Sequence, residues 1–177
     1  MRTIKNALFL CLTLFYMSNA IAHKGLDHRP HIKSDEHFMQ LAITQGKKNP
    51  QFPFGAVIVD KKSGKVLATG VNASNQSPTF HGEIVAINNC ARLHPHLDWS
   101  KVTLYTTAEP CPMCQSAIIW AHIPHVVYAT SIDYLSSHGW DQIQIGSKAV
   151  NKRAPFYKGT ILGGVLASKT DPLFNKS

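Results

Sequence analysis

The chain has 177 residues, a formal net charge of +8 at pH 7 and 44% hydrophobic residues. This length suits one domain with a sizeable core. Only 16% of the residues are charged, which excludes a disordered polyelectrolyte.

The first 22 residues have the pattern of a secretory signal peptide. Arg2 and Lys5 give a positive start, an apolar run follows over residues 7–17, and residues 20–22 read Ala-Ile-Ala, an A-x-A cleavage pattern. The run is short for a bilayer span, although an uncleaved N-terminal anchor stays open as the alternative. Cleavage would remove two basic residues and lower the net charge from +8 to +6. We therefore expect an exported, periplasmic protein that begins at His23 and has no membrane attachment.

The mature chain is predicted to begin with a flexible leader. Residues 23–33 contain three His among Lys, Arg and Pro; they could bind metal loosely, but a solvated leader is the preferred interpretation. Ser34 then supplies a helix cap and Asp35 and Glu36 supply acids in the first turn. This helix is expected to end at Gly46. A single catalytic domain is predicted to occupy residues 34–177.

The next segments alternate between strand and helix patterns. Apolar, β-branched residues at 54–59 and 66–71 flank a turn, which predicts a β-hairpin. A helix over 82–93 follows, in which Cys90 is a small core residue. A strand at 102–106, a helix starting near Pro110 and Pro112, and a strand at 126–130 complete the series. Farther on we expect short helices near Leu135 and 143–145 and a last strand at 161–166. These patterns predict an α/β fold: a three-layer αβα sandwich with a mixed central sheet and helices on both faces.

Two short motifs in this series carry candidate chemistry. The first is His81-Gly82-Glu83, and the second is Pro110-Cys111-Pro112-Met113-Cys114. His81, Cys111 and Cys114 offer three ligands, the number that a catalytic zinc site uses while its fourth position stays open to water. Bound zinc lowers the pKa of that water to about 7. Glu83, two residues after His81, is a candidate for the group that carries protons in the reaction. A closed structural zinc site and a thioredoxin-like redox motif are the alternatives.

The order H-x-E followed by P-C-x-x-C is the signature of zinc deaminases that act on nucleobases. The chain resembles the cytidine/deoxycytidylate deaminase superfamily over about residues 35–160. This resemblance implies that His81, Cys111 and Cys114 hold Zn²⁺ and that Glu83 is the catalytic proton carrier. It also implies a small-molecule nucleobase or nucleoside as substrate.

Within the superfamily the chain looks most similar to the bacterial-type guanine deaminases. The resemblance lies in Phe54 in the first strand, Trp120 six residues after Cys114, and the segment Gly139-Trp140-Asp141. It implies that Phe54, Trp120, Asp141 and Asn72 contact the substrate. It also implies a homodimer, in which the Gly139-Trp140-Asp141 segment can be exchanged between subunits.

Three departures from the guanine branch keep the exact base open. Gln142 stands where that branch has an acid, and the loop from Asn72 to His81 is two residues shorter than usual. His81-Gly82-Glu83-Ile84 looks more like fungal-type cytosine deaminase than the commoner His-Ala-Glu. Guanine deamination to xanthine and ammonia is the preferred hypothesis, and cytosine deamination is an alternative.

Two further alternatives come from other functional classes. A tRNA adenosine deaminase would share the motif, and the positive charge suits phosphate binding. The predicted export and the lack of a Lys/Arg-rich stripe speak against it, so nucleic acid is not an expected partner. A zinc-binding protein without enzymatic activity would have no need of Glu83.

Overall fold

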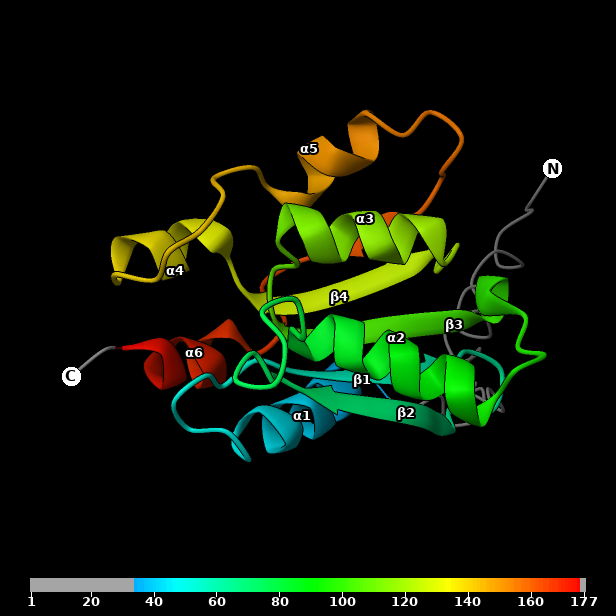
Figure 1. Cartoon of the computed structure of the whole chain (residues 1–177), viewed down its shortest axis with the longest axis horizontal. Helices are drawn as coiled ribbons and strands as arrows, with labels where there is room; N and C mark the ends of the chain where they lie inside the picture. The colour runs from blue at the N-terminus through cyan, green and yellow to red at the C-terminus, as the bar shows by residue number, and fades with distance from the viewer. Residues whose placement is uncertain (1–33, 176–177) are drawn as a thin grey trace, which may run out of the picture. The chain divides into compact units, whose positions relative to one another are not determined.

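The computed structural model describes residues 34–175 (Figure 1). The predicted signal peptide, 1–22, and the predicted leader, 23–33, lie outside the described residues. Within the described part, no helix is both long and apolar enough to cross a membrane.

A mixed five-stranded sheet forms the centre of the described unit, in the order β2-β1-β3-β4-β5. The first three strands in this order pair antiparallel, and β3, β4 and β5 run parallel to one another. The strands are β1 (Gly55–Asp60), β2 (Val66–Val71), β3 (Val102–Ala108), β4 (His125–Thr130) and β5 (Thr160–Leu162).

Helices cover both faces of this sheet because the central strands alternate between two buried sides. In β1, Ala56 and Ile58 pack in one core cluster with α2 (Gly82–Leu93) and α3 (Pro112–Trp120). Val57 and Val59 point to the other face and pack in a second cluster with α1 (Asp35–Gly46). Figure 1 shows α2 and α3 on the same side of the strands. The predicted three-layer αβα sandwich is therefore confirmed.

The predicted elements agree well with the structure up to residue 130. The helix over 82–93 and the strand over 66–71 have the predicted bounds, and Ser34 caps α1 by accepting a hydrogen bond from the His37 amide. Cys90 is fully buried in the core, as expected. A short 3₁₀ turn, η1 (Trp99–Lys101), precedes β3.

The region after residue 130 differs more from the prediction. Leu135 is helical as predicted, but residues 143–145 are not. The last strand ends at Leu162 instead of 166, because Gly163-Gly164 turns the chain and Gly164 has a φ of +85°. The elements of this region are α4 (Ile132–Ser137), α5 (Ser147–Lys152), α6 (Ala167–Thr170) and η2 (Asp171–Phe174).

Close backbone packing fixes the position of α2 on the hairpin. A Cβ placed on Gly70 of β2 would lie 2.1 Å from the Gly82 carbonyl oxygen, so only glycine allows this approach. The start of α2 is thereby held against β1 and β2. The start of α3 follows β3 directly, and the two helix N-termini meet at one edge of the sheet (Figure 1).

Candidate active site

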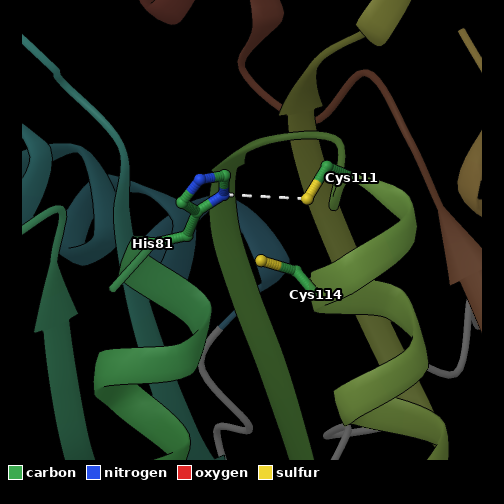
Figure 2. Close-up of side chains that lie close together, drawn as sticks. All are labelled: His81, Cys111 and Cys114. Atoms are coloured by element: carbon green, nitrogen blue, oxygen red, sulfur yellow. Dashed lines mark hydrogen bonds between the residues drawn. The ribbon is translucent and has the colours of Figure 1, made fainter. Parts of the chain in front are cut away.

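The three predicted metal ligands lie at the two meeting helix N-termini. His81 is the N-cap residue of α2, Cys111 is the N-cap residue of α3, and Cys114 lies in the first turn of α3. Among the described residues, neither helix receives a hydrogen bond from its own N-cap side chain. The side chains are therefore free to turn toward one another, as Figure 2 shows.

The spacing of these ligands fits a tetrahedral zinc site. The Nδ1 atom of His81 and the Sγ atom of Cys111 are 3.6 Å apart. Zinc bonds of typical length, at tetrahedral angles, would put about 3.6 Å between a nitrogen and a sulfur ligand. The ligand atoms of all three residues lie within 4.8 Å of one another. One imidazole and two thiols are also the donor types that zinc prefers, so the site fits this metal.

The electrostatics of the site favour a cation. A hydrogen bond from the Cys114 thiol lowers the pKa of Cys111 to about 4, and His81 adds to this effect. The same pairing, together with burial, raises the pKa of Cys114. The positive ends of α2 and α3 further favour a thiolate here. The two sulfurs thus share one proton, which a bound metal ion must displace.

Glu83 lies beside this cluster, in the first turn of α2. Its side chain is buried, with 4% of its surface exposed. Its Oε1 accepts a hydrogen bond from the Thr106 hydroxyl, 3.1 Å away, which fixes the carboxyl group. Burial raises the pKa of Glu83, and the charge on Cys111 adds to this shift. A cation bound to the neighbouring sulfurs would draw this pKa down again, so the carboxyl group is placed to exchange protons.

A cavity of about 630 Å³ opens in front of Glu83, His81 and Cys111. This volume lies in the range of sites that enclose small organic ligands. The remaining lining combines aromatic and aliphatic side chains with amides, a hydroxyl and carboxylates. These lining residues are Pro50, Gln51, Phe52, Phe54, Asn72, Ser74, Glu109, Leu135, Trp140, Asp141, Gln142, Leu173 and Asn175.

Aromatic rings form one wall of the cavity. The Phe54 ring lies 4.9 Å from Phe174 and 5.3 Å from Trp140, measured between ring centroids. Phe52 contacts Trp140 edge-on at 6.0 Å, and the indole N–H of Trp140 donates to the Phe174 carbonyl oxygen at 2.6 Å. The wall therefore joins the residues just before β1 to Trp140 and to the end of the C-terminal 3₁₀ turn η2.

Asn72 faces the cavity with one end of its amide group already engaged. Its Oδ1 accepts hydrogen bonds from the Ser74 amide at 3.1 Å and from the Ser74 hydroxyl at 2.8 Å. Its backbone N–H donates to the Phe54 carbonyl oxygen at 2.9 Å. The Nδ2 hydrogens are therefore the part of the side chain that remains for a ligand.

The structure brings together all of the predicted substrate contacts except Trp120. Phe54, Asn72 and Asp141 line the cavity, but Trp120 is not among the lining residues of the described chain. It lies at the far end of α3, has 71% of its surface exposed and packs against Phe156. Six residues along a helix carry a side chain about 9 Å away from Cys114, so Trp120 does not reach the site.

The Gly139-Trp140-Asp141 segment lines the cavity of its own chain. Trp140 and Asp141 lie in the same lining as His81 and Glu83. The homodimer and the exchange of this segment between subunits both stay predictions.

Several cavity residues were missed in the sequence. Glu109 stands directly before Pro110-Cys111, so its place beside the motif was a usable signal. Leu173 and Asn175 flank the buried Phe174 at the end of η2, 59 and 61 residues after Cys114. Nothing in the local pattern around them indicates a role at this site.

Comparison with known proteins agrees with this geometry. Residues 32–130 match the family described as the cytidine and deoxycytidylate deaminase zinc-binding region. The chain is 36% identical over 115 residues to a guanine deaminase of Bacillus subtilis, which covers 62% of this chain and 72% of that protein. It is 31% identical over 119 residues to a tRNA-specific adenosine deaminase of Rickettsia bellii, covering 66% and 79%.

A solved structure shares the fold. The guanine deaminase from Nitrosomonas europaea matches with a TM-score of 0.71 and 24% sequence identity, covering 80% of this chain and 82% of that one. At this level of identity the likeness concerns the fold alone.

Proposed function

Because the chain belongs to the cytidine and deoxycytidylate deaminase zinc-binding family, we propose that it is a zinc-dependent hydrolytic deaminase of an uncharged nucleobase, with guanine as the preferred substrate. In this reaction, water and guanine give xanthine and ammonia: a C–O bond forms at the ring carbon and its C–N bond to the amine breaks. The observation that carries the substrate class is the charge of the cavity lining.

The lining is acidic although the chain as a whole is basic. The chain has 18 Lys and Arg residues, yet none of the lining residues in the described part is a Lys or Arg. Three carboxyl groups line the cavity instead, those of Glu83, Glu109 and Asp141. Phosphate groups are bound mainly by Lys, Arg, backbone amides and helix N-termini. Such a lining favours a base or nucleoside over a nucleotide or an RNA backbone.

The polar groups of the cavity support guanine within this class. Asn72 presents hydrogen-bond donors, because Ser74 occupies its Oδ1. Guanine offers two adjacent acceptors, O6 and N7, whereas adenine offers N7 beside an amine donor. Asp141 supplies an acceptor for a ring N–H, and the Phe54 ring supplies a surface on which a base can stack.

Glu83 is the proposed proton carrier. When zinc is bound at His81, Cys111 and Cys114, it supplies a water molecule whose pKa is lowered to about 7. The Glu83 carboxylate accepts a proton from the attacking water and delivers it to the ring nitrogen beside the reacting carbon. It then takes the remaining proton from the hydroxyl group added at the ring carbon and passes it to the amine, which leaves as ammonia while the new carbonyl forms. Thr106 keeps the carboxyl group oriented during these transfers.

The substrate is tested by ammonia release from zinc-loaded protein. We expect turnover of guanine to exceed that of guanosine, adenine and cytosine. GMP should be the poorest guanine derivative, because its phosphate adds negative charge to a cavity that has carboxyl groups and no Lys or Arg in its described lining. A preference for GMP, or inosine formation in tRNA, would refute the argument from the cavity lining. Inosine formation in tRNA would instead favour the adenosine deaminase alternative. The 31% identity to the tRNA-specific adenosine deaminase of Rickettsia bellii is the observation behind that alternative.

The role of Glu83 is tested by Glu83→Gln. The amide keeps an oxygen that can accept from Thr106, so the variant should fold and bind zinc, while turnover falls about 10²- to 10⁴-fold. Undiminished turnover would exclude Glu83 as proton carrier. Loss of zinc together with activity would assign it a structural role at the metal.

A further inference from the structure

The segment between α4 and α5, residues 138–146, contributes Trp140, Asp141 and Gln142 to the cavity lining. We call it the α4–α5 segment. Its geometry matters for substrate binding because a ring of the aromatic wall, Trp140, and a proposed substrate contact, Asp141, both lie on it. The question is what holds it in place over the metal ligands.

One carboxyl group contacts both helices that bound the α4–α5 segment. The Oε2 atom of Glu109 accepts a hydrogen bond from the amide of Ile132, the first residue of α4, at 3.1 Å. Its Oε1 atom accepts from the amide and the hydroxyl of Ser147, the first residue of α5, both at 2.8 Å. The helix before the segment and the helix after it are therefore both tied to a single side chain.

The residues at the start of α5 pack tightly against the Glu109 carboxyl group. Ser147 is fully buried, and a Cβ on Gly146 would lie 3.3 Å from Oε1 of Glu109. The Glu109 backbone is also fixed, because its N–H donates to the Thr130 carbonyl oxygen at 2.7 Å. The Tyr128 side chain also hydrogen-bonds to this carboxylate, so together with the three donors from α4 and α5 its oxygens are occupied by the protein's own groups.

Glu109 also belongs to the loop that carries a metal ligand, because it stands two residues before Cys111. We propose that Glu109 is a positioning residue that couples the metal-binding loop to the α4–α5 segment, and so sets the place of Trp140 and Asp141 relative to the reacting carbon. Its kinetic consequence rests on the proposed deaminase function. Its structural consequence, the anchoring of the α4–α5 segment, does not.

The decisive variant is Glu109→Gln in the zinc-loaded protein. Its amide can present an oxygen to one helix only, and its NH₂ group then faces an N–H donor of the other. We expect amide hydrogen exchange within residues 138–146 to accelerate roughly ten- to hundred-fold, as for the loss of hydrogen bonds to a charged group. Zinc content and exchange in α2 should stay as in the wild type. The KM for guanine should rise about tenfold or more with a smaller change in kcat, since the substrate-binding wall moves while Glu83 does not.

The matched control is Asp133→Asn, an equal loss of charge at an exposed residue of α4. It should leave exchange in the α4–α5 segment unchanged. Unchanged exchange in Glu109→Gln with zinc retained would overturn the proposal. If Glu109→Gln loses zinc, Ser147→Ala decides instead, because it removes one hydrogen bond to Glu109 without changing a residue of the metal-binding loop. Faster exchange then supports the coupling, and unchanged exchange overturns it. If the wild type deaminates no base, the proposed function fails while the exchange experiment still decides the role of Glu109.

Discussion

The substitution Gly82→Ala tests how the metal motif and the cavity wall are joined. A Cβ on Gly82 would lie 2.7 Å from the carbonyl oxygen of Phe54 and 3.1 Å from its carbonyl carbon. That same oxygen accepts the Asn72 backbone N–H at 2.9 Å. The added methyl group would therefore push on the backbone of two cavity residues at once, although it creates the His-Ala-Glu motif that is commoner in the superfamily.

Two opposing effects set the magnitude of this change. Overpacking a tight contact typically costs about 1–3 kcal/mol of stability. Here the atoms in the way are the Phe54 carbonyl group, and backbone atoms shift less easily than the end of a flexible side chain. Replacing glycine by alanine inside a helix gains at most about 1 kcal/mol, and less at the first helical residue. The clash should therefore dominate, with a net loss of about 1–2 kcal/mol. For a domain of this size that corresponds to a fall in Tm of about 2–8 °C.

The assay combines thermal unfolding with steady-state kinetics on zinc-loaded protein. We expect the lower Tm together with a raised KM for guanine. The backbone of Phe54 and Asn72 moves, while Glu83 and the metal ligands keep their positions at the starts of α2 and α3. Asn88→Ala is the matched control, because Asn88 is exposed on the same helix and its substitution changes helix propensity without a clash. A Gly82→Ala protein with wild-type Tm and KM would refute the reasoning.

Four further predictions follow from the sequence and the site. The purified protein should hold about one zinc per chain, and Cys111→Ser should lower the zinc content measured by metal analysis; full retention would contradict the ligand assignment. Zinc affinity should weaken as pH falls, because the raised pKa of Cys114 keeps a proton on the site that the metal must displace; competition with a chelator at several pH values measures this. Phe174→Ala should cost about 3–5 kcal/mol of stability in denaturant unfolding, because the ring is fully buried, whereas Phe156→Ala, at a side chain 56% exposed, should cost far less. N-terminal sequencing of protein from its native host should find His23 as the first residue, and an intact Met1 would contradict the predicted export.

The metal centre could be predicted from the sequence because its chemistry is encoded locally. Cys111 and Cys114 are three residues apart, which brings them together at the start of one helix. Glu83 follows His81 within the first turn of another. Between the two motifs the sequence predicts a helix and then a strand, which the structure confirms as α2 and β3. That the two helix starts meet at one edge of the sheet is a finding of the structure.

The cavity wall was harder to predict because it depends on contacts between distant segments. Phe174 contacts Phe54 across 120 positions of the chain, and no short pattern marks such a pair. Trp120 was assigned to the cavity from its offset to Cys114, but the rise of α3 carries it away from the site. Glu109 was visible beside the motif, yet its role depends on Ile132 and Ser147, which only the folded chain brings to it.

The C-terminal origin of one cavity wall has a consequence for the order in which the site is assembled. A growing chain emerges N-terminal end first, so His81, Cys111 and Cys114 appear well before Phe174 and its neighbours. At typical synthesis rates of about 5–20 residues per second, roughly sixty residues correspond to an interval of a few seconds. During that interval the three ligand residues are present in the chain, whereas the residues of the C-terminal part of the wall are not. The metal ligands are thus complete in the growing chain before the residues that close the aromatic wall have been made.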